Sequence, residues 1–174
     1  MIANPETDET DAFLKARPRL FAAAYRMLGS VSDAEDILQD AFLRWQAAPQ
    51  AQVQDPTGYL IRITTRLCLD QLKSARARRE TYPGEWLPEP ILTEDATELL
   101  DHDVTVALLL ALETLSPLER AAFLLHDIFD NAYEDISAAL NRTPASCRQL
   151  AARARRKVQK LRPHAPRIRT RDAI

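Results

Sequence analysis

Residues 132–161 carry the pattern that most limits what this chain can fold into. The segment predicts a short helix over 133–140, a turn over 141–143 and a longer helix that begins at Pro144. Thr143 has the side chain of a helix N-cap, and proline suits the first helical turn because its missing N–H group would have no partner there. Two amphipathic helices joined by so short a turn predict a helix–turn–helix.

The second helix of this motif separates into an apolar face and a strongly basic face. Helical spacing places the apolar side chains inward, namely Cys147, Leu150, Ala151, Ala154, Val158 and Leu161. Arginine reaches the acceptor edge of guanine as a fork and glutamine reads adenine, while the other cations suit phosphates. A basic helix without a specific target is the alternative. The side chains expected to meet DNA are Arg142, Ser146, Arg148, Gln149, Arg153, Arg155, Arg156 and Lys157.

The net charge of -2 hides a strong alternation of charge along the chain. Residues 1–56 hold 5 basic and 9 acidic side chains, and residues 57–82 hold 6 and 2. Residues 83–140 hold 1 and 13, and residues 141–174 hold 11 and 1. Local charge decides which face approaches a phosphate backbone, so the two basic segments predict two contacts with nucleic acid. Taken singly, each run also fits an ordinary solvated face.

The composition predicts an all-α fold. Glycine is scarce, with 3 residues, while alanine, leucine and arginine dominate and alternating β-branched runs are absent. Capping-box sequences start at Ser32 and Ser116, Gly29 ends the first helix, and Pro18 offers a later start for it. Together these signals predict helices over 11–28, 32–48, 56–79, 96–114, 116–129, 133–140 and 144–161.

The helical pattern breaks between residues 80 and 95. This stretch has three prolines and a glycine, together with Trp86 and Leu87. Such a composition predicts a Pro-rich linker between two small helical domains. Trp86 either docks on another surface or packs locally within an extended linker.

Two helices of the first half carry opposite charge. The helix over 32–48 has an acidic face beside Phe42 and Trp45, formed by Asp33, Glu35, Asp36, Gln39 and Asp40. Carboxylates without a histidine fit a protein partner with basic side chains better than a metal. The helix over 56–79 predicts a second contact with DNA. Its basic and polar side chains are Arg62, Thr64, Thr65, Arg66, Asp70, Gln71, Lys73, Arg76, Arg78 and Arg79.

Nothing in the sequence predicts an enzyme, a cofactor or a metal site. No nucleophile–base pair or glycine-rich phosphate loop is present, and His126 beside Asp127 fits a surface or packing role. Cys68 and Cys147 are expected to be small core residues in a reducing cytoplasm. No apolar run approaches the ~20 residues of a membrane span, and the polar start differs from a signal peptide. A cytoplasmic protein without membrane contact is expected.

Three segments resemble the extracytoplasmic-function sigma factors of the sigma-70 family. LFAAAYRMLGSVSDAEDILQDAFLRW is similar to the first part of region 2, and PTGYLIRITTRLCLDQLKSARARRE to the part that meets the -10 element. LSPLERAAFLLHDIFDNAYEDISAALNRTPASCRQLAARARRKV resembles region 4, which reads the -35 element. The resemblance covers residues 12–162. It implies region 2 over 11–80, a linker over 81–95, region 4 over 96–162 and a basic tail over 163–174.

The resemblance also implies a role for each face. Asp36, Gln39, Asp40 and Arg44 would bind the β′ clamp helices of core RNA polymerase, and region 4 would meet the β subunit flap. Arg62, Thr65, Arg66, Asp70, Lys73 and Arg76 would lie at the -10 element, with the loop over 46–57 near a flipped base. Arg148, Gln149 and Arg153 match positions that face the -35 element, but Ala152 stands where the family often has a larger residue.

The linker motif WLPEP resembles a subgroup that normally carries a polyketide-cyclase-like domain after region 4. This chain ends at Ile174, so we expect that domain to be absent, either naturally or through truncation. An anti-sigma factor is another expected partner. In free protein, the acidic block 83–140 is a candidate to cover the basic segment 57–82.

Two other functions compete with a sigma factor that directs promoter-specific initiation. The chain could be a stand-alone helix–turn–helix regulator, with residues 1–95 as a sensor or dimerisation domain that works without polymerase. It could also be an all-helical adaptor that binds only protein, for which no salt-dependent DNA binding is expected.

Overall fold

The computed structural model describes residues 5–49, 52–81 and 106–161, and this part of the chain is helical and contains no strand. The first unit consists of α1 (Pro5–Leu28), α2 (Val31–Gln46) and α3 (Pro56–Thr81). The second consists of α5 (Val106–Glu113), α6 (Pro117–Phe123), the π-helical turn η2 (Leu124–Ile128), α7 (Tyr133–Leu140) and α8 (Pro144–Leu161). The all-α prediction is confirmed. The expected linker over 81–95 and the start of the helix over 96–114 fall almost wholly outside the described residues.

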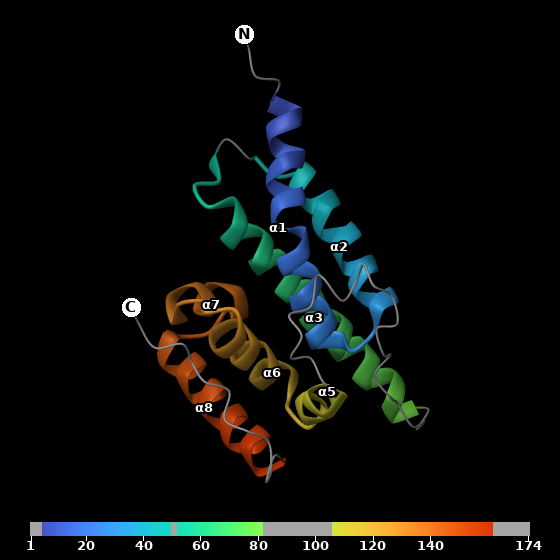
Figure 1. The fold of residues 1–174 in the computed structure, drawn as a ribbon, viewed down its shortest axis with the longest axis vertical. Coiled ribbons are helices and arrows are strands. Elements are labelled where there is room, and N and C mark those ends of the chain that lie inside the picture. Colours follow the sequence, from blue (N-terminus) through green and yellow to red (C-terminus); the bar gives the residue numbers. More distant parts are fainter. Residues whose placement is uncertain (1–4, 50–51, 82–105, 162–174) are drawn as a thin grey trace.

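The two units lie against each other (Figure 1), with α3 packed against α1 and α2 on one side and α7 on another. Each unit has its own buried centre. Leu20, Phe21, Tyr25, Leu60 and Cys68 are buried in the first unit, whereas Leu112, Ala122, Leu124, Ile136 and Cys147 are buried in the second. Burial raises the pKa of both cysteine thiols, which agrees with their prediction as core residues.

Local signals explain most helix ends. The helices over 133–140 and 144–161 begin and end where the sequence predicted. The capping box at Ser116 is present, since its Oγ accepts from the Glu119 N–H at 3.3 Å and Glu119 Oε2 accepts from the Ser116 N–H at 3.1 Å. Asp55 caps α3 through its Oδ1, which accepts from the Gly58 N–H at 3.0 Å.

Two predicted helix starts are wrong. The cap of α2 is Ser30 and not Ser32, because Gly29 adopts a left-handed φ of 72° and leaves Ser30 extended just before the helix. The alternative start of α1 at Pro18 is also wrong, since Pro18 lies inside a continuous helix. Buried Phe13 and Leu20 on either side of the exposed proline hold the helix together across it.

Leu14 of α1 is exposed, and so is Leu161, which was expected in the apolar face of the last helix. Leu14 is 57% exposed because it shares its helix face with Pro18, one turn later, and this face looks toward solvent. Leu161 is 52% exposed because it is the last residue of α8 and lies beyond the buried stripe that ends at Val158. The helix expected over 116–129 also changes character at Leu124, where a π-helical turn replaces the α-helix.

Candidate nucleic-acid interface

The motif formed by α7 and α8 is built by a left-handed residue and a cap. Asn141 has φ 52° and ends α7, and the Thr143 Oγ1 accepts from the Ser146 N–H at 3.2 Å before α8 begins at Pro144. The apolar stripe packs inward, with Cys147, Leu150, Ala151, Ala154 and Val158 all buried. This burial fixes which face of α8 is left for a ligand.

The face of α8 that remains exposed is basic. Arg148, Gln149, Arg153 and Arg156 are exposed, as is Arg142 in the turn, while Ser146 is half-buried. The structure therefore brings these predicted DNA contacts to the solvent side of one motif, where cations can meet phosphates and the first turns can reach base edges.

Two other cations of α8 are engaged within the second unit. The Lys157 ammonium donates to Glu119 Oε2 at 2.7 Å, and Arg155 donates to Asp127 Oδ1 at 2.6 Å and to the Tyr133 hydroxyl at 3.0 Å. Burial alone would raise the pKa of the Glu119 carboxyl, but the hydrogen bonds from Lys157 and Ser116 outweigh it and hold that pKa below its usual value.

The hydrogen bond to Asp127 raises the pKa of the Arg155 guanidinium. Arg155 and Lys157 thus differ from their expected role as phosphate contacts, because each has a carboxylate partner in this structure. Sequence spacing did not reveal the Arg155 pair, since Asp127 lies in the π-helical turn, where helical periodicity does not hold.

Apart from Arg66 and the half-buried Gln71, the residues predicted on α3 divide into three groups. Asp70 and Lys73 are exposed, and half-buried Arg62 stacks over the Tyr59 ring with its Cζ 5.3 Å from the centroid. Thr65 is 5% exposed and Thr64 is 1% exposed, so neither can contact DNA in this arrangement. Their burial follows from the packing of α3 between α1, α2 and α7. Arg76 lies in α3, and its side chain is outside the described part of the chain, as are those of Arg78 and Arg79.

Arg66 of α3 contacts the second unit directly. Its Nη2 donates to the Ala138 carbonyl at 2.8 Å and its Nε to the Ala139 carbonyl at 3.3 Å, near the carboxyl end of α7. A cation is favoured at this end because the last carbonyls of a helix lack helical partners and carry negative partial charge. A residue expected at the -10 element thus contacts the first helix of the motif that was expected to read the -35 element.

Arginines on both units extend this interface. Arg19 of α1 donates to the Phe129 carbonyl at 2.5 Å and to Asn131 Oδ1 at 2.7 Å. Arg120 of α6 is buried and donates to the Met27 carbonyl at 2.5 Å. Sequence reasoning missed these residues, because a side chain that binds a distant carbonyl leaves no periodic signal.

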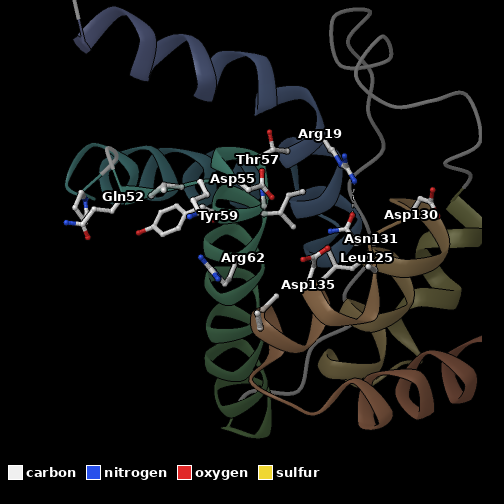
Figure 2. A pocket seen from close by; sticks show the side chains of 18 residues that line it. Arg19, Gln52, Asp55, Thr57, Tyr59, Arg62, Leu125, Asp130, Asn131 and Asp135 are labelled. Atoms are coloured by element: carbon white, nitrogen blue, oxygen red, sulfur yellow. Dashed lines mark hydrogen bonds between the residues drawn. The ribbon is translucent and has the colours of Figure 1, made fainter.

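A groove of about 860 Å³ opens where the units meet. Figure 2 shows Arg62 and Tyr59 of α3 on one side of it and Asp135 of α7 on the other. The loop expected near a flipped base lines the same groove through Gln52, Val53, Gln54, Asp55 and Thr57. The loop and the helix–turn–helix are therefore neighbours in this structure.

The acidic face of α2 is exposed as predicted. Glu35, Asp36, Gln39, Asp40 and Arg44 all reach solvent, and Arg17 donates to both carboxylate oxygens of Glu35 at 3.1 and 2.8 Å. Trp45, expected beside this face, is buried and lies 5.7 Å from the Tyr59 ring.

The exposed apolar residue at this end of α2 is Leu43, which is 57% exposed and was missed from the sequence. Its position three residues after Asp40 was the available signal. In the described residues no group of three or more histidines, cysteines or carboxylates is placed to hold a metal ion. No helix among them is long and apolar enough to cross a membrane.

Comparison with known protein families identifies the family to which this chain belongs. The model for Sigma-70 region 2 matches residues 12–78, and the model for Sigma-70, region 4 matches residues 105–158. The chain belongs to the sigma-70 family. The resemblance drawn from the three sequence segments is confirmed, and α1–α3 correspond to region 2 while α5–α8 fall in region 4.

Similar sigma-70 proteins are extracytoplasmic-function sigma factors. The ECF RNA polymerase sigma factor SigJ of Mycobacterium tuberculosis is 44% identical over 156 residues, which cover 86% of this chain and 50% of SigJ. The probable ECF RNA polymerase sigma factor SigI of the same species is 41% identical over 153 residues, covering 84% of this chain and 52% of SigI. This sigma-70 chain thus spans about half the length of these curated relatives.

Solved structures agree with this sigma-70 fold. The crystal structure of Mycobacterium tuberculosis SigJ matches with a TM-score of 0.69 and 40% identity, covering 86% of this chain and 53% of that one. The sigma factor RpoE of Bartonella quintana, in complex with the anti-sigma factor NepR, matches with a TM-score of 0.71 and 20% identity. That match covers 88% of this chain and 96% of RpoE, and it supports the fold alone.

Proposed function

We propose that this chain is a sigma factor that binds core RNA polymerase and directs initiation at promoters with a -10 and a -35 element. The observation that carries the proposal is the presence, in one chain, of regions 2 and 4 with oppositely charged exposed faces on α2 and α8. Neither region has a catalytic task in this proposal, and the site of action is the cytoplasm, where the polymerase works.

Each face has one role in the proposal. Asp36, Gln39, Asp40 and Arg44 contact the β′ clamp helices, with exposed Leu43 adding apolar contact area at the same end of α2. Arg62, Arg66, Asp70, Lys73 and Arg76 serve the -10 element. Arg142, Ser146, Arg148, Gln149, Arg153 and Arg156 serve the -35 element, and region 4 meets the β flap. Lys157 reaches a phosphate only after it leaves Glu119.

The packing of the two units adds a condition to this function. Arg66 uses its Nε and Nη2 on the α7 carbonyls, so a contact of its whole guanidinium fork with DNA requires the contact between α3 and α7 to open when the chain is bound to polymerase and promoter. An anti-sigma factor, the kind of partner that RpoE has in its complex with NepR, is a further proposed partner that would control this opening. A C-terminal regulatory domain is the other controlling element that we consider.

A gel shift with and without core polymerase separates the two candidate functions. A sigma factor gives a promoter complex in which the chain and core enzyme are both present, and the chain alone binds the same DNA weakly. Equal binding without polymerase would instead support the stand-alone regulator. Run-off transcription on the same template, with core enzyme alone as the control, then measures promoter-specific initiation.

A further inference from the structure

Tyr133, the first residue of α7, lies beside the basic helix α8 and contacts two of its arginines. The Arg148 guanidinium lies over the Tyr133 ring, with its Cζ 5.5 Å from the ring centroid. The Arg155 Nη2 donates to the Tyr133 hydroxyl at 3.0 Å. Residues 148 and 155 are about two turns apart on α8, so the Tyr133 side chain contacts one arginine from each of two turns of the helix.

The ring of Tyr133 is itself held in place. Arg155, which donates to its hydroxyl, is fixed by Asp127 at 2.6 Å. The imidazole of His126 stacks on the ring, with centroids 4.1 Å apart and an interplanar angle of 27°. His126 Nδ1 lies 3.0 Å from the Asn131 carbonyl oxygen, which anchors the imidazole to the loop between η2 and α7. The Tyr133 ring therefore has a fixed position, and a flexible side chain such as Arg148 can pack against it.

Apart from the Tyr133 ring, few side chains are placed to restrict the rotamers of Arg148. Its side chain is 57% exposed, and Glu134 lies 4.0 Å away at the limit of an ion pair. The residue one turn further along the same face is Ala152, whose methyl group is too short to pack along an arginine. A long exposed arginine samples many rotamers, and a bidentate contact with a base requires one of them.

We propose that Tyr133 is a positioning residue for promoter reading, which holds the Arg148 guanidinium ready for a base edge of the -35 element. This inference rests on the proposed function, and it assigns to an aromatic residue of the first helix a part in base selection by the second. The ring acts through Arg148 and makes no base contact itself. Ring and guanidinium attract each other because the face of the ring carries negative potential.

The test measures base preference, which a merely structural role would not change. A promoter is first selected from a library with a randomised -35 element by wild-type chain and core polymerase. Run-off transcription on single-base variants then identifies the position whose preference is lost, by about tenfold, in Arg148→Ala. At that position Tyr133→Leu and Tyr133→Met lower the preference by about two- to fivefold. Combined with Arg148→Ala they lower it no further.

Controls separate the ring from its neighbours. Tyr133→Phe keeps the ring and retains the preference, and Glu134→Gln removes the distant carboxylate and also retains it. Phenylalanine analogues with increasing fluorination at position 133 weaken the negative face of the ring with little change of shape, so the preference falls stepwise with fluorine number. This series keeps the test decisive even where a variant without the ring does not fold.

Three results overturn the inference. The first is unchanged base preference in folded variants without the ring. The second is an equal loss of transcription on every single-base variant, which indicates a structural role. The third is a flat fluorination series. If the wild-type chain and core polymerase select no -35 element at all, the proposed function fails instead, and this outcome is visible before any variant is made.

Discussion

The Arg66 side chain of α3 donates a hydrogen bond of 2.8 Å to the carbonyl oxygen of Ala138 in α7. This contact joins the helix proposed for the -10 element to the motif proposed for the -35 element. It uses the negative end of a short helix as a partner for a cation that would otherwise be available to phosphate. The free chain therefore holds its two proposed DNA-reading units together through one of the residues that we propose to contact DNA.

Arg19 should stabilise the packing of the two units. Arg19→Ala removes the hydrogen bonds to the Phe129 carbonyl and Asn131 Oδ1, so we expect the free energy of unfolding to fall by about 1 kcal/mol. The distance between probes on α2 and α8 should become longer and more variable, as measured by double electron–electron resonance. Arg17→Ala is the matched control, since Arg17 pairs with Glu35 inside the first unit and should leave the probe distance unchanged.

Gly29 should resist replacement by residues with a Cβ atom. Its φ of 72° lies in the left-handed region, so Gly29→Ala should lower the free energy of unfolding by about 1–2 kcal/mol, measured by urea denaturation. Gly29→Asn should cost clearly less, because asparagine tolerates this conformation. Equal stability of the alanine variant and the wild type would contradict the left-handed turn between α1 and α2.

Glu119 should make stability depend on pH. Its pKa is lowered in the folded chain, so its contribution is present above the unfolded pKa and is lost as the pH falls through the folded pKa. We expect Lys157→Met to lower the free energy of unfolding by about 1 kcal/mol at pH 7. The difference from wild type should shrink as the pH falls below the ordinary pKa of a glutamate, and it should vanish only below the lowered folded pKa, where the carboxyl is protonated in both states. Urea denaturation between pH 3 and pH 7 measures it, and a difference independent of pH would rule out this pair as its source.

The acidic face of α2 should be needed for polymerase binding. Asp36→Arg combined with Asp40→Arg reverses two exposed charges, and we expect binding to core polymerase in a pull-down to fall by at least about tenfold. Asp11→Arg is the control, because it also reverses an acidic charge but lies on α1 beside Lys15. Intact binding by the double variant would show that the proposed interface lies elsewhere.

Local chemistry made much of the fold predictable. Thr143 and Pro144, and Ser116 with Glu119, are short-range signals whose partners lie three residues away, and the structure has the corresponding helix starts. The capping sequence at Ser32 failed because the left-handed Gly29 places the helix start two residues earlier. The backbone conformation of Gly29 thus determines that Ser30, and not Ser32, caps α2.

The parts of the site that could not be predicted depend on contacts between distant residues. Arg19, Arg66 and Arg120 bind backbone carbonyl groups 72 to 110 residues away, and such pairs follow no helical period. The burial of Thr65 has the same origin, since it requires knowledge of what covers α3. Exposure of α8 was predictable, because its apolar stripe is complete within the helix itself.

The most direct test is run-off transcription by core RNA polymerase from a template library with a randomised upstream region, with and without this chain. The account predicts that transcripts appear only with the chain, and that active templates share two short motifs at a fixed spacing. Arg148→Ala should relax the upstream motif, and Lys73→Ala should weaken use of the downstream one. A single motif that the chain binds equally well without polymerase, or transcripts that do not depend on the chain, would contradict the account.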